Sequence, residues 1–526
     1  MNLRTVGRLS VLATGGAVLL ATGCSVGPNF TKPEVPVTAT WRTANDARIA
    51  TQKAADSVWW KAFNDPALDR LVELAYQQNL PLQIAGLRIL EARAQLGVAT
   101  GMQFPQSQFL FGKATWIGIS QSVPLASIAP RNYGDYQVGF DAAWELDFWG
   151  KYRRGVEAET AGVLASVADY YSAIVSVSAE VARTYVVLRT FEALVEKSRE
   201  NERVQEEGLQ IAESRFHNGA TSELDPSQAT TLLESTRASI PPLQSSAQQA
   251  RNALSTLLGQ PAGTIDALLE GPPGVPKAPA SVAVGVPAEM LRRRPDIRSA
   301  ELSAAAQCAR IGVAKAALYP SFSLLGTIGL ETTSNTTAPS HKFFSPNSIF
   351  YSAGPQINWP FLNYGRLTNA VRVEDARFQE TLVGYRDIVL RAVQEVEDAL
   401  AGFTNAQAAL LFQQRAVTSA QRAVQLSLVQ YREGAADYQR VLDAQRSLLQ
   451  QENTLVQTSS SVATNLIGLY KALGGGWESR QGQPAVPEPT QRQMKERTNW
   501  GDMLPQPSPP VSAQSSPQGK QVGSLP

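Results

Sequence analysis

Apolar and polar residues alternate over two short stretches of the chain. In residues 136–147 every second side chain is apolar or small, and the acids Asp141, Glu145 and Asp147 all belong to the other set. Residues 349–361 repeat this alternation. A period of two places each set on its own face of a β-strand, as in membrane barrels and in half-buried strands of soluble sheets. With their expected partners, the predicted strands are 106–119, 135–148, 321–330 and 349–361.

A long stretch without proline follows each pair of strands. The chain has no proline between Pro130 and Pro226, or between Pro360 and Pro484. Helices of roughly 65 residues, on the order of 100 Å long, are therefore permitted beyond the glycines at 150 and 365. In the second stretch apolar residues recur every seven positions, which predicts helices that supercoil around each other. The recurring residues are Leu382, Val389, Val396, Phe403, Leu410, Val417, Val424 and Tyr431.

The two halves of the chain match at a constant offset of 215 residues. Trp144 pairs with Trp359 (359 − 144 = 215), and the same offset joins Gly150 to Gly365. It also joins Pro105 to Pro320, Phe216 to Tyr431 and Gly219 to Gly434. We therefore expect one duplicated unit of strands and long helices. The predicted organisation is a signal peptide at 1–23, a linker at 24–65, repeats at 66–270 and 271–478, and a disordered tail at 479–526.

The N-terminus is typical of an exported protein. Arg4 and Arg8 precede an apolar segment at 9–20, which is too short to span a bilayer and predicts a secretory signal. The small residues at 21–23 before Cys24 resemble a bacterial lipobox, which implies lipidation of Cys24. The alternative is ordinary signal cleavage that leaves Cys24 free. Ser25 in place of an aspartate implies, by the same resemblance, sorting to the outer membrane.

Composition excludes several classes of function. Lys and Arg number 47 against 46 Asp and Glu, so the chain lacks the basic surplus that nucleic-acid binding requires. Two histidines and two cysteines cannot supply a His/Cys metal site of three or four ligands, although a site made of carboxylates alone stays open. Walker, His-Glu-x-x-His and Gly-x-Ser-x-Gly motifs are not found. We therefore expect that the chain is not an enzyme, that it binds no cofactor and that it has no nucleic-acid partner.

The predicted strands require more than one copy of the chain if they lie in a membrane. Four strands cannot close a membrane barrel, for which about eight is the minimum. Open strand edges are not tolerated in lipid, so several copies must share one barrel. Two, three or more copies satisfy this arithmetic. The long helices would then extend the barrel as a tube.

Seven motifs resemble the TolC-like outer membrane efflux factor family, and within it the NodT/OprM-type lipoproteins. They are Gly23-Cys-Ser-Val-Gly-Pro-Asn-Phe30, Trp59-Trp-Lys-Ala-Phe-Asn-Asp-Pro-Ala-Leu-Asp69, Trp144-Glu-Leu-Asp-Phe-Trp-Gly-Lys-Tyr-Arg-Arg154, Arg293-Arg-Pro-Asp-Ile-Arg298, Ile311-Gly-Val-Ala-Lys315, Tyr431-Arg-Glu-Gly434 and Leu442-Asp-Ala-Gln-Arg-Ser447. The resemblance implies a mostly helical fold with transmembrane β-strands. It implies a homotrimer with a shared 12-stranded barrel and an α-helical periplasmic tunnel.

The same resemblance implies a function and partners. The chain would be the outer membrane channel of a tripartite efflux system, anchored by lipid in the outer membrane of a Gram-negative bacterium and extending into the periplasm. It would passively export drugs or other small molecules delivered by an inner-membrane RND or MFS-type pump and a periplasmic adaptor (membrane fusion) protein. The alternatives are a type I protein-secretion outlet of the same fold and, in another class, a periplasmic coiled-coil scaffold without a pore.

The resemblance also implies positions for functional residues. The turns after the long helices correspond to the periplasmic tips, and the residues expected there for adaptor docking are Gly219, Thr221, Asp225 and Gly434. The residues expected at the aperture are Asp437, Tyr438, Arg440 and Asp443. Two positions where the family has Arg and Asp are Ala436 and Arg440 here, so its gating network is not carried over intact. Asp141 and Glu145 are expected to line the barrel lumen, and Asp147 either the lumen or its rim.

Overall fold

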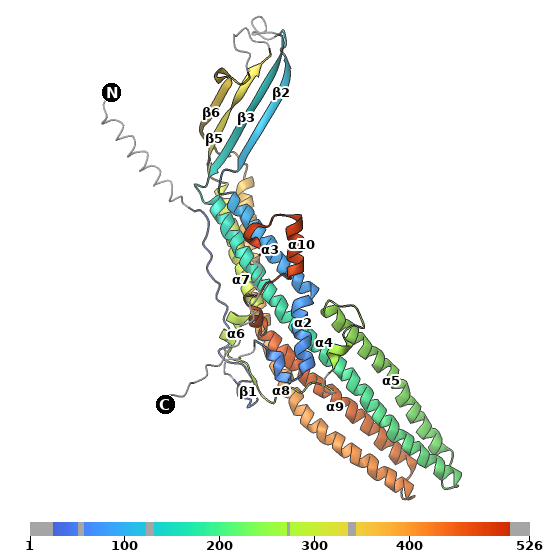
Figure 1. The fold of residues 1–526 in the computed structure, drawn as a ribbon. Helices are drawn as coiled ribbons and strands as arrows, with labels where there is room; N and C mark the ends of the chain where they lie inside the picture. Colours follow the sequence, from blue (N-terminus) through green and yellow to red (C-terminus); the bar gives the residue numbers. More distant parts are fainter. Residues whose placement is uncertain (1–24, 51–56, 123–130, 271–273, 335–342, 505–526) are drawn as a thin grey trace, which may run out of the picture.

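The molecule is elongated, with a β-sheet at one end, a helical shaft, and two helical hairpins at the other end (Figure 1). The computed structural model describes residues 25–50, 57–122, 131–270, 274–334 and 343–504. The predicted signal peptide and Cys24 therefore lie outside the described residues.

Four antiparallel strands form the sheet at the first end. They are β2 (Ser107–Gly118), β3 (Asn132–Leu146), β5 (Ser321–Thr333) and β6 (Ile349–Asn358), in the order β2-β3-β5-β6. The hairpins β2-β3 and β5-β6 belong to the first and second halves of the chain, and the pairing of β3 with β5 joins the halves. A separate two-residue strand, β1 (Ile49–Ala50), pairs in parallel with β4 (Val282–Ala283) lower down the molecule.

The register places apolar residues from all four strands on one face of the sheet, although some apolar residues, such as Phe109 and Phe111 of β2, lie on the other face. One cross-strand row consists of Leu110, Phe140, Ile328 and Tyr351, each directly opposite the next. These four side chains are between 44% and 80% exposed, so no other part of the described chain covers them. A sheet with one uncovered apolar face suits contact with lipid. The alternation in the sequence predicted this arrangement, and the fold class is confirmed.

The two longest helices begin at equivalent places below the sheet. They are α4 (Lys151–His217) and α8 (Arg366–Arg432), each of 67 residues. Gly150 (φ 77°) and Gly365 (φ 81°) precede them in the left-handed conformation, which glycine adopts at little cost. The Asp147 carboxylate accepts hydrogen bonds from the backbone N–H groups of Tyr152 (3.1 Å) and Arg153 (2.9 Å), so it caps the start of α4.

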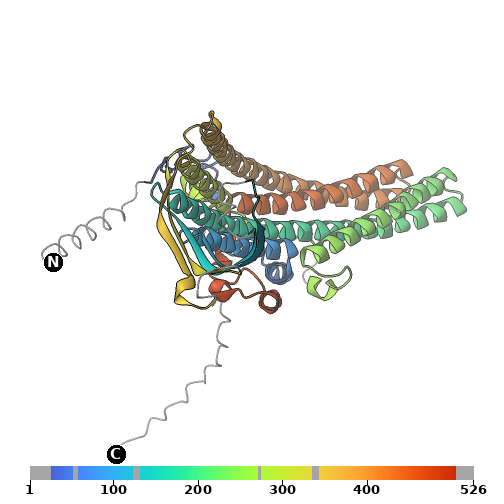
Figure 2. The ribbon, with the colours of Figure 1, turned by 90° about the horizontal axis from the view of Figure 1, so that it is seen from above.

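Each long helix turns back into a shorter partner and forms a hairpin. Helix α4 pairs with α5 (Leu224–Leu257), and α8 pairs with α9 (Tyr438–Ala472). The two hairpins lie next to each other along the shaft, the first in green and the second in orange and red (Figure 2). Nearer the sheet, α3 (Leu80–Gly101) and α7 (Pro295–Ala316) occupy equivalent places at the 215-residue offset. Helices α2 (Pro66–Gln78) and α6 (Pro287–Arg293) complete the middle of the shaft.

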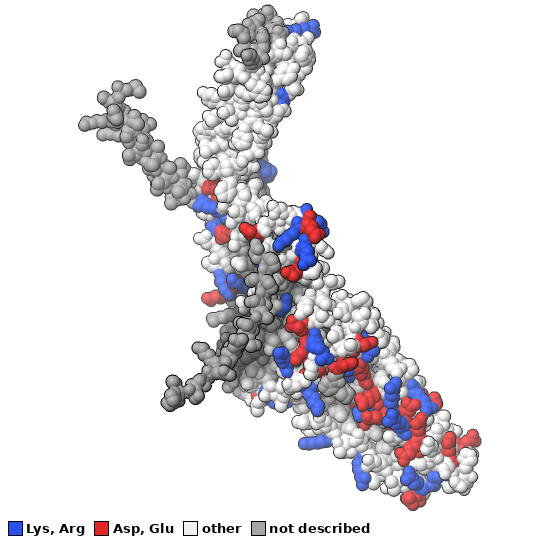
Figure 3. Space-filling model, viewed as in Figure 1, with Lys and Arg blue, Asp and Glu red and all other residues white. Residues whose placement is uncertain are grey.

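The main hydrophobic core lies in the middle of the shaft, where α2, α4, α8 and α9 meet. The seven-residue repeat in α8 supplies Val389, Val396 and Phe403, all of which are fully buried. These residues confirm that the repeat marks the packed side of the helix. Charged side chains gather instead on the outside of the helical part, whereas the face of the sheet seen in Figure 3 carries few.

The predicted disorder of the tail from residue 479 is wrong as far as residue 504. Residues 477–504 run back along α3 and contain the helix α10 (Glu488–Arg497), drawn in red beside α3 in Figure 1. Val486, Met494 and Leu504 are buried there against Leu90 of α3. A high content of Pro, Gln and Ser suggested disorder, but these few apolar residues are spaced so that all of them pack along α3. Residues 505–526 lie outside the described residues.

Candidate functional site

Both hairpins end in a tight turn built around a left-handed glycine. Gly219 (φ 68°) follows α4 and Gly434 (φ 76°) follows α8. The turns have the same hydrogen bonds: the N–H of Ala220 donates to the Arg215 carbonyl and the N–H of Ala435 to the Gln430 carbonyl, each at 2.8 Å. These are the bonds with which a glycine-containing cap closes a helix C-terminus. Both glycines therefore have a structural role, which does not depend on any partner.

A cluster of polar residues joins the two hairpins at the tip, and we call Arg215, Thr221, Asp225 and Tyr431 the tip cluster. The Asp225 carboxylate accepts hydrogen bonds from the hydroxyl groups of Thr221 (2.5 Å) and Tyr431 (2.8 Å). Thr221 and Asp225 belong to the first hairpin and Tyr431 to the second. Since a hydrogen bond to an ionised acceptor is stronger than a neutral one, this contact ties the two tips together.

Arg215 strengthens the same junction from the end of α4. Its guanidinium donates to the carbonyls of Tyr431 (2.7 Å) and Arg432 (3.2 Å) at the C-terminus of α8, where positive charge is favourable. It also lies over the Tyr431 ring, 4.8 Å from the centroid. Burial, together with the Asp225 carboxylate, raises the pKa of the Tyr431 hydroxyl to about 12. Tyr431 therefore remains a hydrogen-bond donor at physiological pH.

Tyr438, which we expected at the aperture, lies inside the protein. Only 1% of it is exposed, and its ring makes an edge contact with the Tyr431 ring at 5.0 Å between centroids. Within the part of the chain that the structure describes, its buried hydroxyl has no hydrogen-bond partner. Burial is also the main reason why the pKa of Tyr438 is raised. The first turn of α9 directs this residue toward the hairpin core, so Tyr438 lines no surface in this conformation.

The other expected aperture residues are on the surface of α9. The carboxylate of Asp437 lies 3.8 Å from the Arg440 guanidinium, and both side chains are more than 70% exposed. Asp443 accepts a hydrogen bond of 3.0 Å from Gln439 and is also exposed. Within the described part of the chain, these groups make no hydrogen bond or ion pair with the tip cluster. They are available to a neighbouring molecule or to an aqueous passage.

Sequence analysis missed Arg215 and Tyr431 as members of the tip cluster. The internal duplication contained a signal that could have identified them. At the offset of 215, Tyr431 matches Phe216, Arg215 matches Gln430, Thr221 matches Ala436 and Asp225 matches Arg440. All four members of the cluster therefore differ from their repeat mates, in turns whose glycines are the same. A contact between the two tips, rather than within each of them, explains such a difference.

Polar side chains also occupy the buried interface between α4 and α9. Asn201 donates a 2.5 Å hydrogen bond to the carboxylate of Glu452, and Gln445 donates to the Val204 carbonyl at 3.2 Å. Gln205 is 2% exposed, and both of its amide atoms lack a hydrogen-bond partner in the described residues. Thr190 and Ser460 continue the row nearer the sheet. The interface between the hairpins is thus more polar than the core above it.

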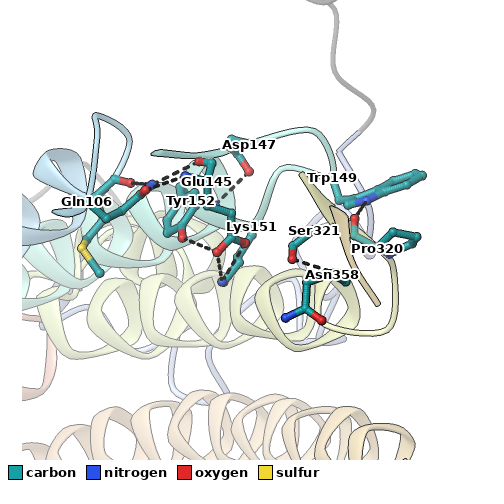
Figure 4. Close-up of polar contacts among 10 residues, drawn as sticks. Gln106, Glu145, Asp147, Trp149, Lys151, Tyr152, Pro320, Ser321 and Asn358 are labelled. Atoms are coloured by element: carbon teal, nitrogen blue, oxygen red, sulfur yellow. Dashed lines mark hydrogen bonds and ion pairs between the residues drawn. The ribbon is translucent and has the colours of Figure 1, made fainter. Parts of the chain in front are cut away.

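The base of the sheet is the second place where predicted site residues gather (Figure 4). Glu145 accepts hydrogen bonds from the Lys151 ammonium and the Tyr152 hydroxyl, both at 3.0 Å. Gln106 bonds to the backbone of Glu145 with both atoms of its amide. A cavity of about 180 Å³ lies beside these residues. The charge of Glu145 is therefore balanced by Lys151 within the chain.

Asp141 lies on the face of the sheet opposite to the apolar one. It accepts a 2.8 Å hydrogen bond from the Thr327 hydroxyl across the pairing of β3 with β5. Asp147 does not face this side of the sheet as a free acid, because it caps α4 and pairs with Arg153 at 3.1 Å. Among the described residues no three His, Cys, Asp or Glu side chains are grouped so as to hold a metal ion.

The chain reaches the base of the sheet directly after Cys24. The N–H of Val26 donates to the Trp149 carbonyl at 3.0 Å, and Ser25 packs against Gly150. Gly27 packs equally closely on Gly312 of α7, where a Cβ atom would lie 2.5 Å from the neighbouring Cα. These contacts hold residues 25–27 level with the point where the strands end and the long helices begin.

Comparison with known proteins identifies the same architecture. The sequence profile described as "Outer membrane efflux protein" matches residues 71–260 and again 286–475, which are offset by 215 residues. The chain is 31% identical to the cation efflux system protein CusC of Escherichia coli O6:H1 over 461 residues, 88% of this chain and 97% of that protein. It is also 31% identical to nodulation protein T of Rhizobium leguminosarum bv. trifolii, covering 87% and 96% of the two chains.

A solved structure of the outer-membrane channel OprN matches as well. The TM-score is 0.79 at 32% sequence identity, and the match covers 86% of this chain and all of OprN.

Proposed function

Since the chain belongs to the outer membrane efflux protein family, we propose that three copies form one conduit through which drugs or other small molecules leave the cell. The protein is an outer membrane efflux channel component, and it lies in the outer membrane. The channel itself would be passive, and an inner-membrane pump would supply the energy for transport.

One observation carries this proposal above the others. An open sheet of four strands, with one uncovered and largely apolar face, continues directly into two helices of 67 residues. Lipid does not tolerate open strand edges, so the sheet must be completed by other copies. Three copies give 12 strands, which is within the range of membrane barrels. The helices of the three copies then form a tube below the barrel.

We place the closed entrance of the conduit at the hairpin tips. The tip cluster holds the second hairpin against the first through the bonds of Asp225 and Arg215 to Tyr431. Breaking these bonds would free the α8–α9 hairpin to move outward. Asp437, Arg440 and Asp443 are exposed beside it and would line the aperture. Acids repeated around a symmetry axis favour cations.

An adaptor protein would dock on the outside of the tips. The turns that contain Gly219 and Gly434, with Thr221 and Asp225 beside the first, form the ends of the molecule. A periplasmic adaptor and an inner-membrane pump of the RND or MFS type would complete the system. Asp141 and Glu145 would face the barrel lumen as partnered acids, so they would add little net charge to the passage.

Lipidation of Cys24 would add an anchor to the barrel. Ser25 lies against Gly150, just below the last residues of β3. An acyl chain on the preceding residue would therefore start at the level of the inner leaflet of the outer membrane.

Two measurements test the proposed function. Purified full-length protein is inserted into planar bilayers, and discrete conductance steps are expected. In cells that lack their own channel, the protein is expected to lower antibiotic accumulation only when an adaptor and a pump are also present. Normal outer membrane insertion without conductance would indicate a scaffold without a pore. Release of a polypeptide carrying a type I secretion signal, without any change in antibiotic accumulation, would indicate a protein-secretion outlet.

A further inference from the structure

The sheet of one copy ends in two open edges, β2 and β6. The outward backbone groups of each edge can be identified from the bonds inside the sheet. The N–H of Ser334 donates to the Gly134 carbonyl, which marks this opposed pair as hydrogen-bonded. Since such pairs alternate along an antiparallel ladder, Phe140 and Ile328 form a hydrogen-bonded pair, and Asp141 and Thr327 form the closer, non-hydrogen-bonded kind.

The internal duplication relates the two hairpins of the sheet residue by residue. Ser107 opposes Ala143 in the first hairpin and Ser321 opposes Asn358 in the second. The offsets are therefore 214 for the first strand (321 − 107 = 214) and 215 for the second (358 − 143 = 215). The single residue of difference comes from Gln106, which has no counterpart between Pro320 and Ser321. Applied to the pairs from Ser107–Ala143 to Trp116–Gly134, these offsets reproduce the ten pairs of the second hairpin.

The same offsets can be applied to the junction between the repeats. Within one copy, β3 of the first repeat pairs with β5 of the second. In a closed ring of repeats the equivalent junction brings β6 of one copy against β2 of the next. The pair Asp141–Thr327 inside a copy then corresponds to the pair Gln356–Lys113 between copies (141 + 215 = 356 and 327 − 214 = 113). We infer that β6 and β2 of neighbouring copies pair in this register, with Gln356 directly opposite Lys113 of the neighbouring copy.

The chemistry of the residues agrees with this register. Gln356 and Lys113 both belong to the face that carries Asp141, and both are exposed in the single copy. Where Asp141 accepts a hydrogen bond from Thr327 inside a copy, the Gln356 carbonyl can accept one from the Lys113 ammonium between copies. The opposite face places Ala353 against Trp116 of the neighbouring copy, so the apolar band continues across the seam.

Pro355 gives the seam one distinctive property. At the offset of 215, Pro355 is equivalent to Phe140. The N–H of Phe140 points away from the β2-β3 hairpin and toward β5. The nitrogen of Pro355 therefore faces the neighbouring copy, and it has no hydrogen to donate. Proline is tolerated at such an edge position. The seam therefore has one ladder hydrogen bond fewer than the junction inside the chain, at Pro355 opposite Ala114 of the neighbouring copy. We expect the seam between copies to open before the junction within each copy.

Cysteine cross-linking in the full-length protein tests the register. Lys113→Cys is combined with Gln356→Cys, because a non-hydrogen-bonded pair brings the Cβ atoms close enough for a disulfide. The matched controls combine Lys113→Cys with Gly354→Cys or with Asn358→Cys, which correspond to slips of two residues in either direction. A side chain at Gly354 meets no described atom within 4 Å. Cys308 is buried and stays in place, and the parent chain and the single variants serve as blanks.

Mild oxidation of outer membranes is expected to give covalent dimers and trimers about tenfold faster for the Lys113→Cys/Gln356→Cys pair than for either control, because residues two apart on one face are too distant for a relaxed disulfide. Faster cross-linking of a control pair would overturn the register.

The inference rests on the proposed shared barrel, and unboiled samples on a gel separate the two. No cross-linking in protein that still migrates as a trimer overturns the register alone. No cross-linking in monomeric protein overturns the assembly as well.

Discussion

At the scale of single residues, the tip shows how one hydroxyl group decides a contact. Tyr431 and Tyr438 are both buried, and their rings touch. The Tyr431 hydroxyl donates to Asp225, whereas the Tyr438 hydroxyl has no partner among the described residues. Replacement of tyrosine by phenylalanine removes a hydroxyl group at either position, but only at Tyr431 does it also remove a hydrogen bond.

We expect Tyr431→Phe to weaken the closed tip by about 1–3 kcal/mol, because the Asp225 carboxylate loses a partly buried donor. Single-channel conductance in planar bilayers, or antibiotic uptake by cells, should rise. Tyr438→Phe is the matched control, and it should leave both quantities near the parent values because its hydroxyl pairs with nothing. An equal response of the two variants would contradict a specific role for the tip cluster.

A second residue-scale prediction concerns pH. The Arg48 guanidinium donates to both carboxylate oxygens of Asp46, and the Arg48 backbone N–H donates to one of them; these bonds lower the pKa of Asp46 to about 2. The guanidinium also donates to the Thr404 carbonyl of α8. Because the folded pKa lies below the ordinary value of about 3.9, the stabilisation is complete above that value and is lost as the pH falls toward 2. Asp46→Asn should therefore unfold at a lower temperature than the parent at pH 6.

The difference in unfolding temperature should shrink as the pH is lowered below 4. Asp437→Asn is the control, because its carboxylate lies 3.8 Å from Arg440 in an exposed pair, and such pairs contribute little. A difference for Asp46→Asn that stays constant down to pH 2 would contradict the assigned ion pair.

At the scale of elements, the strands and long helices follow patterns of several residues. The period of two in β3 and β6 and the period of seven in α8 are repeated often enough to predict both the type of each element and its apolar side. The tail at 477–504 escaped prediction because its order depends on a groove along α3, which lies nearly 400 residues away in sequence. The burial of Tyr438 escaped it for a similar reason, since only the facing helix decides which side of α9 is inside.

The polar interface between α4 and α9 leads to a prediction about stability. Gln205 is buried with no hydrogen bond among the described residues, whereas Gln445 donates one to the Val204 carbonyl. Gln205→Leu should raise stability by about 1–2 kcal/mol, because it removes an unsatisfied amide. Gln445→Leu should change stability less, because the lost hydrogen bond to the Val204 carbonyl offsets the removal of an amide oxygen that also lacks a partner among the described residues.

Thermal unfolding of the detergent-solubilised protein measures both effects. If the interface must slide when the tips open, Gln205→Leu should also reduce the frequency of opening in planar bilayers. A lower unfolding temperature for Gln205→Leu than for Gln445→Leu would show that Gln205 is not the unsatisfied group.

At the scale of the whole molecule, the two faces of the sheet differ in what they require. Leu110 and Phe109 are neighbours in β2, and both are about half exposed or more, but Leu110 belongs to the apolar face and Phe109 to the face of Asp141. An arginine on the lipid side of a barrel costs about 2–4 kcal/mol near the bilayer centre, whereas a lumen position tolerates it.

We therefore expect Leu110→Arg to reduce strongly the amount of trimer in the outer membrane. Phe109→Arg should assemble normally, with a guanidinium opposite Asp141. Quantification of the trimer in membrane fractions, on gels of unboiled samples, distinguishes them. Equal loss of trimer in both variants would show that β2 does not separate lipid from lumen.

The match between the two halves also has an evolutionary consequence. A gene for one half alone would encode a subunit that closes the same ring from six identical copies, with six identical tips. In that ancestor a contact like that between Asp225 and Tyr431 would recur at every junction, whereas in the present chain the equivalent positions carry Arg440 and Phe216, so only one junction in each chain can form it. Fusion of two genes made the positions independent of each other. Duplication thus allows one junction of each chain to carry the tip cluster while the other junction does not.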